Sequence, residues 1–285
     1  MTSATQASLP SSEKLAADLA AIRIPACPAV VTEVLREARK DEPNFKILAR
    51  IISSDVGMSA MAVKLANSPM FGSAAPVKSV QQAINRLGTS NILNIIVAAA
   101  LRSSVDGLPA DFLQHFWDMA ASRALCAGLL ARKHVGIQPE DAYTYGLFQN
   151  AAVPVLMQHF STYAELYVRA GEHGDHLVAL ERAHFHSDHA VVGWLLARNW
   201  GLPPKIASAI QHHHNPERYI LPEEELPSNA LALIAVTQLA EYIITELGGA
   251  ALDVSQRAFE DARSFLGTTD HDLDEFREIV AAALA

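Results

Sequence analysis

The chain has 285 residues, 50% of them hydrophobic, so it can bury one large core or two fused smaller ones without disulfides. Its 22 Lys and Arg residues against 31 Asp and Glu residues give a formal net charge of −9, which on average repels nucleic-acid phosphates. The two cysteines, Cys27 and Cys126, form neither a CxxC motif nor a Cys/His zinc pattern, as is typical of a reducing compartment. We therefore expect a cytoplasmic protein with no nucleic-acid partner.

The N-terminal segment carries no sign of secretion. The first twenty residues lack the basic leader and the apolar run that precede a signal cleavage site, and residues 1–19 are predicted to be a flexible tail. The longest apolar segment, residues 92–101, is about half the roughly twenty residues that a membrane helix requires. No membrane span is predicted.

Apolar residues recur three and four apart along nearly the whole chain, which predicts an all-α fold. Asn44 and Asp55 are placed to cap the helices that follow them. Ser79 and Gln82 form a capping box, and Gly88 is typical of a helix end. The predicted helices of this first part are 28–40, 45–52, 56–68, 80–87 and 90–101.

The segment 80–102 has the helix, short turn and second helix of a DNA reader. Its second helix carries no Arg or Lys before Arg102, whereas a recognition helix presents polar and basic side chains to base edges. We therefore do not expect DNA binding here.

Residues 104–111 contain the Gly and Pro of a hinge between two lobes. Pro154 is expected to interrupt one of the elements that follow. The predicted helical segments of the second part are 112–133, 139–148, 151–160, 163–170, 176–183, 188–200, 204–214, 228–247, 255–266 and 270–284.

Histidine is the one unusual chemical resource: the chain has twelve, and six of them lie in HFHSDHA (184–190) and QHHHNP (211–216). Such histidines can bind a metal only if three or four ligands converge from different helices. Glu181 and His184 form a single ExxH pair, whereas a di-iron bundle needs two. The alternative is solvated helix-end histidines that contact carbonyl groups or one another.

Other catalytic patterns are missing from the sequence. It contains no GxSxG nucleophile elbow, and its one SxxK motif, residues 11–14, lies in the predicted tail. No glycine-rich loop ends in GK[ST], so no phosphate-binding loop is expected.

Three motifs carry a resemblance to a known family. They are LANSPMFG (65–72), SVQQAINRLG (79–88) and HSDHAVVGWLLARNWGLP (186–203), followed by the histidine run near residue 213. Together they resemble the bacterial HDOD domain over residues 20–245. The resemblance implies an N-terminal helical lobe over about 20–105, a lobe similar to HD-type metal-dependent phosphohydrolases over about 110–245, and a C-terminal helical extension over 246–285.

The resemblance also implies what has replaced the metal ligands of an HD hydrolase. The His-Asp pair of such an enzyme falls on Gln149 and Asn150, a further histidine falls on Met119, and a further aspartate falls on Glu241. Neutral amides and a thioether are poor ligands for hard divalent cations. We therefore expect no metal and no cofactor, and we expect Gln149 and Asn150 to bond to each other and to nearby backbone.

His189, His213 and His214 match positions that HDOD sequences keep without being hydrolases. With Met119, Gln149 and Asn150 they define the expected vestigial pocket. The resemblance implies a non-catalytic signalling or scaffolding module that binds protein partners in a bacterial pathway. Two alternatives stay open. One is a metal-dependent phosphodiesterase that uses His186 with these three histidines, and the other is a nucleotide-sensing module without catalysis.

Overall fold

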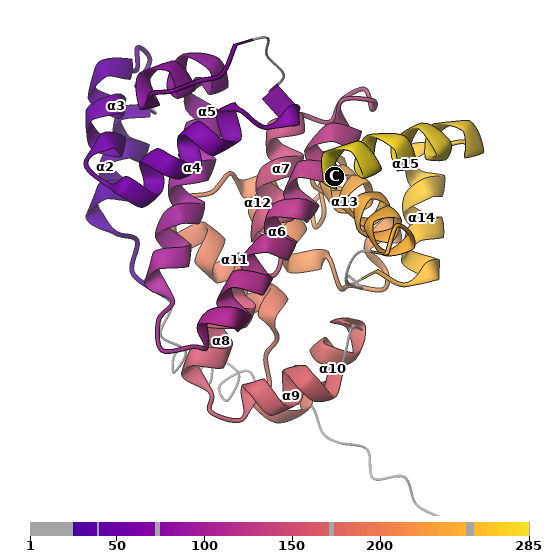
Figure 1. Ribbon diagram of the computed structural model, residues 1–285. Helices are drawn as coiled ribbons and strands as arrows, with labels where there is room; N and C mark the ends of the chain where they lie inside the picture. Colours follow the sequence, from indigo (N-terminus) through magenta and orange to yellow (C-terminus); the bar gives the residue numbers. More distant parts are fainter. Residues whose placement is uncertain (1–24, 39, 72–74, 171–173, 249–253, 285) are drawn as a thin grey trace, which may run out of the picture.

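The computed structural model describes residues 25–38, 40–71, 75–170, 174–248 and 254–284, and within these ranges every regular element is helical (Figure 1). The all-α prediction is therefore confirmed. The predicted tail and the first residues of the predicted N-terminal lobe lie outside the described residues.

The first group of helices begins and ends where local chemistry predicts. The Asn44 side chain accepts hydrogen bonds from two backbone amides of the next turn, and Asp55 accepts one from the Met58 amide at 2.8 Å. Leu48 and Ile52 are buried on the inner face. The elements are α2 (Ala29–Ala38), α3 (Phe45–Ser53), α4 (Val56–Ala66), η1 (Pro69–Phe71) and α5 (Val80–Ser104).

Gly88 breaks α5 into two parts. Its φ of 74° lies in the left-handed region that glycine tolerates, and the two parts of the helix are bent by 116°. The predicted capping box forms only in part. The Ser79 hydroxyl accepts from the Gln82 amide at 3.2 Å, but the Gln82 side chain accepts from the Lys78 amide at 2.8 Å instead of the expected Ser79 amide.

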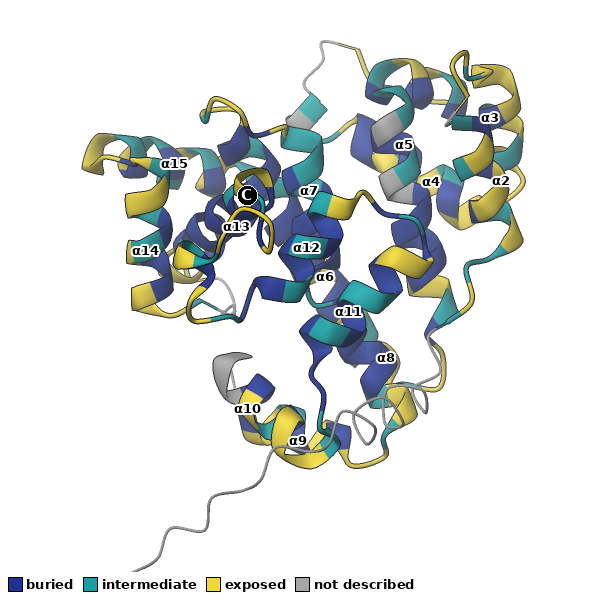
Figure 2. Ribbon diagram, turned by 180° about the vertical axis from the view of Figure 1, so that it is seen from behind, coloured by how far each residue is buried: buried dark blue, intermediate teal, exposed yellow. Residues whose placement is uncertain are grey.

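In the second group α13 packs against α6, α7 and α12, and most of its residues are buried (Figure 2). The prediction that Pro154 interrupts its element is wrong. Pro154 lies in the first turn of α8, where its missing N–H leaves no helical bond unmade. The elements are α6 (Ala110–Ala131), α7 (Pro139–Phe148), α8 (Ala152–His159), α9 (Tyr163–Ala170), α10 (Gly174–Phe185), α11 (His189–Asn199), α12 (Pro204–His212), η2 (Arg218–Ile220) and α13 (Ser228–Glu246).

The chain ends in two helices, α14 (Gln256–Leu266) and α15 (Asp270–Leu284), which pack against α13 and α6 (Figure 1). Their apolar faces are buried at Phe259, Phe276 and Val280. The α13 helix is long and apolar enough to cross a membrane, but 72% of its apolar window is buried inside the protein. That burial is typical of a core helix. The bent pair that makes up α5 passes the same test only if it is counted as one span.

The two groups of helices meet where α5 packs against α7, where η1 packs against α6, and at a hydrogen bond near the start of α2. The second part of α5 packs against α7, close to the connection into α6. Away from that connection, the Trp200 indole Nε1 donates a hydrogen bond of 2.8 Å to the carbonyl oxygen of Pro25, just before α2. The start of the described chain is thereby held to the end of α11.

Candidate functional site

The site forms where α11 begins and α12 ends, and its first part is the cap of α11. Asp188 accepts a hydrogen bond from the Val191 amide at 2.9 Å and pairs with the Arg182 guanidinium at 2.6 Å. Burial alone raises the pKa of Asp188, but the Val191 amide and the positive charge of Arg182 outweigh it and lower that pKa. The ionised cap fixes the first turn of α11, which carries His189.

His189 is oriented by a buried carboxylate. Its Nδ1 donates to the Glu181 carboxylate at 2.8 Å, and its backbone amide donates to the same group at 3.0 Å. The Tyr163 hydroxyl also donates to Glu181, and the pKa of Tyr163 is raised by burial and by the negative charge of Glu181. With Nδ1 engaged, the Nε2 atom of His189 is left to face the neighbouring histidines.

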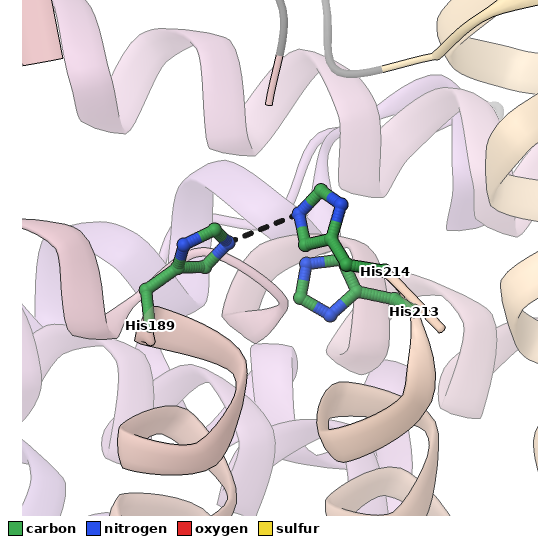
Figure 3. Close-up of side chains that lie close together, drawn as sticks. All are labelled: His189, His213 and His214. Atoms are coloured by element: carbon green, nitrogen blue, oxygen red, sulfur yellow. Dashed lines mark hydrogen bonds between the residues drawn. The ribbon is translucent and has the colours of Figure 1, made fainter. Parts of the chain in front are cut away.

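His213 and His214 follow the last turn of α12, and their rings turn toward His189 (Figure 3). The His189 and His214 Nε2 atoms are 3.1 Å apart, which makes a hydrogen bond in which one nitrogen carries the proton. The three residues are buried, and one ligand nitrogen from each lies within 4.8 Å of the others. The cluster therefore joins the ends of two helices through imidazole groups.

His213 is held neutral at physiological pH. Burial lowers its pKa well below the usual value, and the nearby His214 and His189 lower it further. Its Nδ1 donates to the Ile210 carbonyl oxygen at 2.7 Å, and its Nε2 is 3.1 Å from the amide oxygen of Asn150. A neutral imidazole has one N–H, so a half-turn of the Asn150 amide lets that amide donate to Nε2.

A second polar cluster lies beside the first. The Gln149 amide nitrogen donates to a Glu241 oxygen at 2.8 Å, and the Arg123 Nε donates to the same oxygen at 2.5 Å. All three side chains are buried. The Arg123 guanidinium thus supplies a positive charge directly beside Gln149 and Glu241.

The expected bond between Gln149 and Asn150 is not formed. Gln149 bonds to Glu241 on α13, and Asn150 contacts His213 at the end of α12. The two amides are adjacent in the chain but face different helices because they lie where α7 ends and α8 begins. Glu241 lies beside Gln149, as the resemblance implied.

The remaining histidines behave differently from the cluster. The expectation of solvated histidines is wrong for His189, His213 and His214, although they do contact a carbonyl group and one another. His184 is exposed and its Nδ1 contacts the Leu180 carbonyl oxygen. His186 is outside the three-histidine cluster. The structure therefore brings together three of the four histidines of the metal-dependent alternative.

Sequence reasoning missed two functional side chains. Arg123 is one helical turn after Met119 in α6, and the only signal was a charged residue in a strongly apolar helix. Glu181 was considered only for its spacing to His184, yet its partner is His189. Met119 itself is half-buried and packs against the hydrophobic core.

The two clusters differ in how well they fit a metal. Gln149 and Asn150 offer amides, and Arg123 already places a cation against Glu241, so the HD position does not fit a hard divalent ion. The three imidazoles fit an ion such as Zn²⁺, whose ligands at about 2.0–2.1 Å in a tetrahedral site lie roughly 3.3 Å apart. Glu181 and the Ile210 carbonyl hold Nδ1 of two of these histidines, as outer partners of metal-binding histidines do.

Comparisons with known proteins bear on the family and the fold. A family model of the HDOD domain matches residues 24–216. A protein from Treponema pallidum (strain Nichols), named as uncharacterised, is 28% identical over 235 residues, which are 79% of this chain and 43% of that protein. The chain thus spans less than half the length of this relative.

Two crystal structures share the fold. A protein from Shewanella amazonensis SB2B, named only as a proposed phosphohydrolase, is 22% identical with a TM-score of 0.70, and the match covers 96% of this chain and 95% of that one. An HDOD domain protein of unknown function from Geobacter sulfurreducens is 21% identical with a TM-score of 0.68, covering 95% and 94% of the two chains. Since the family model matches more than half of its residues, the chain belongs to the HDOD domain family.

Proposed function

We propose that this chain is a non-catalytic module that acts in bacterial signal transduction by binding other proteins. The observation that carries the proposal is the buried contact of Glu241 with Arg123 and Gln149, at the position where an HD hydrolase holds its His-Asp ligands. At that position the Arg123 and Gln149 side chains both donate hydrogen bonds to the Glu241 carboxylate.

The electrostatics of this contact oppose a catalytic ion. A divalent cation placed beside Glu241 meets the Arg123 guanidinium at hydrogen-bond distance, and repulsion between buried charges is strong because the local dielectric is low. Gln149 and Asn150 provide no anionic ligand to offset that repulsion. Losing even outer-sphere partners costs about 10 to 100-fold in metal affinity or activity, so losing direct ligands should cost more.

The consequence for chemistry follows from the same residues. In HD-type hydrolysis the metal lowers the pKa of a bound water and polarises the phosphoryl oxygen. Gln149 and Asn150 can do neither, because a neutral amide is no base and both amides are engaged in hydrogen bonds. The family resemblance then favours protein partners in the cytoplasm, with no nucleic acid and no membrane.

A hydrolysis screen tests the non-catalytic part of this proposal. Purified, tag-free protein is incubated with Mn²⁺, Fe²⁺ or Zn²⁺ and with bis-p-nitrophenyl phosphate or cyclic dinucleotides. We expect no more product than the metal alone releases. Turnover that is lost in His213→Ala, while it is kept in the matched variant of the exposed His184, His184→Ala, would contradict the proposal.

The partner is tested by affinity capture from the native host, with crosslinking and mass spectrometry. We expect a signalling protein to crosslink reproducibly to the folded chain and to disappear when unlabelled chain competes. If no protein is captured under any growth condition, the scaffolding role is contradicted even if the hydrolysis screen is negative.

One specific observation favours a second candidate, a metal-dependent phosphohydrolase. The ligand nitrogens of His189, His213 and His214 lie within 4.8 Å of one another, and a similar fold carries a proposed phosphohydrolase name. The test is elemental analysis of protein purified without added metal or chelator. Stoichiometric metal that is lost in His213→Ala, together with turnover, would support this candidate.

A further inference from the structure

A cavity of about 180 Å³ lies between the two groups of helices, away from the histidine cluster. Its walls come from α4 and α5 on one side and from α6 and α7 on the other. Most of the lining is apolar, and the apolar side chains on which the argument depends are Met61, Leu65, Ala98, Leu125 and Leu147. An apolar cavity of roughly 150 Å³ is enough to bind benzene, so this one can hold a single aromatic ring with short substituents.

Aromatic and sulfur groups make the cavity suited to a ring. Trp117 and Tyr143 line it, and Met61 contributes a thioether. Aromatic pairs and sulfur–aromatic contacts stabilise a bound ring beyond the effect of area alone. Burial raises the pKa of Tyr143 to about 12, so its hydroxyl stays protonated and remains a hydrogen-bond donor.

Two buried polar atoms at this cavity have no hydrogen-bond partner among the described residues. They are the Trp117 indole Nε1 and the Ser68 hydroxyl oxygen. Trp117 is only 5% exposed. Buried polar groups in native proteins are nearly always paired, and an indole N–H can only donate. Both atoms are closed off from solvent, so a ligand in the cavity does not reach either of them, and the ligand preference comes from the other groups of the lining.

The polar side chains that line the cavity favour an anion. Lys64 and Arg102 both line it, against a single carboxylate from Asp118. Lys64 is exposed and has no ion-pair partner in the part of the chain that the structure describes. Arg102 donates to Gln114 at 2.9 Å, and Gln114 donates to Asp118 at 2.6 Å, so that carboxylate is already engaged. This local positive excess lies in a chain whose net charge is −9.

We propose that this cavity binds a small aromatic carboxylate. Its ring would lie among Trp117, Tyr143 and Met61, and its carboxylate would face Lys64 and Arg102. The ligand contacts helices of both groups and so stabilises their packing. This site is separate from the histidine cluster, and the proposal does not depend on whether the chain is catalytic.

Calorimetric titration of the full chain with phenylacetate tests the proposal, with its neutral primary amide, phenylacetamide, and the cationic benzylamine as comparison probes. We expect saturable 1:1 binding of the carboxylate. The amide should bind about tenfold more weakly, since a hydrogen bond to a charged group contributes more than one to a neutral group. Lys64→Gln with Arg102→Gln should reduce carboxylate binding to the level of the amide.

Three further variants distinguish binding in this cavity from non-specific binding to the protein. Trp117→Leu removes the aromatic wall, and we expect about fivefold weaker binding from the lost ring contact. Ala98→Leu fills the cavity and should abolish binding, with folding checked by circular dichroism. Lys46→Gln, on α3 and away from the cavity, is the matched charge control and should bind as the parent does.

The proposal is overturned if the carboxylate shows no saturable binding up to its solubility limit. It is also overturned if the amine binds more tightly than the carboxylate, which would assign the charge preference to Asp118. Unchanged carboxylate binding in both the Lys64→Gln/Arg102→Gln variant and a folded Ala98→Leu variant also overturns the proposal, because the carboxylate then binds elsewhere on the protein.

Discussion

Replacing Arg123 by methionine removes the cation from the buried contact with Glu241 while keeping most of the side-chain volume. The Arg123 and Glu241 side chains are only 6% and 2% exposed, so water cannot replace the lost charge. The variant also loses the weaker hydrogen bond of 3.4 Å to the Gly146 carbonyl. Removing one partner of a buried ion pair costs about 3–5 kcal/mol, and we expect this loss in the free energy of unfolding.

A second variant separates the charge from the packing. Arg123→Met with Glu241→Gln removes both charges but keeps an oxygen that can accept from Gln149. We expect this pair to recover all but about 1–2 kcal/mol, the value of the remaining lost hydrogen bonds. The exposed arginine variant Arg50→Met is the control and should change stability by less than about 0.5 kcal/mol.

The assay is urea unfolding followed by far-ultraviolet circular dichroism at pH 7 and pH 5. In Arg123→Met the Glu241 carboxyl stays buried but loses the Arg123 charge, and burial then raises its folded-state pKa above the unfolded value. Such a group favours the folded state below the unfolded pKa, and that contribution is lost as pH rises through the folded pKa. The defect should therefore shrink at pH 5. A loss below about 1 kcal/mol at both pH values, or no recovery in the double variant, would refute the reasoning.

Three other outcomes follow from close packing and from burial. Gly146→Ala should lower the free energy of unfolding by about 2–3 kcal/mol, because the new Cβ would lie 3.0 Å from the backbone of α6. Gly193→Ala should also cost about 2–3 kcal/mol, because the new Cβ would lie 2.9 Å from Cγ2 of Ile210, a fully buried β-branched side chain with a restricted χ1, and a loss below about 1 kcal/mol for either variant in urea unfolding would contradict this account. Because the folded state lowers the pKa of His213, the contribution of this residue to the free energy of unfolding is fully present above pH 6.5 and falls as the pH drops below it. In His213→Gln, measured with chelator present, the free energy of unfolding should fall less steeply with decreasing pH than in the parent. Burial raises the pKa of Cys126 to about 12, so iodoacetamide at pH 8 should label Cys27 and spare Cys126 in the folded chain, as mass spectrometry can read out.

The fold was predictable where local chemistry decides it. Asn44 and Asp55 cap their helices through their own side chains, and Gly88 breaks α5 because it has no Cβ to oppose a positive φ. Pro154 was misread because a proline ends a helix only when the N–H that it lacks is needed, and that depends on where the helix begins. Such one-residue offsets cannot be fixed by periodicity alone.

The site was predictable as a set of positions but not as a set of contacts. The resemblance identified Gln149, Asn150 and the three histidines, and the structure brings them to neighbouring clusters. It could not show that Arg123 neutralises Glu241, because these residues are 118 positions apart and meet only when α6 packs on α13. The pairing of Glu181 with His189 was hidden for a related reason, since the turn between α10 and α11 sets it.

The hydrogen bond from Trp200 to Pro25 limits how the first group of helices can move. That group is joined to the rest of the protein by the covalent chain at residues 105–109, by the packing of α5 on α7 and of η1 on α6, and by this contact. The contact adds an attachment at the start of α2, which the helix packing alone does not hold. The width of the cavity between α4 and α5 on one side and α6 and α7 on the other therefore depends on attachments at both ends of the first group.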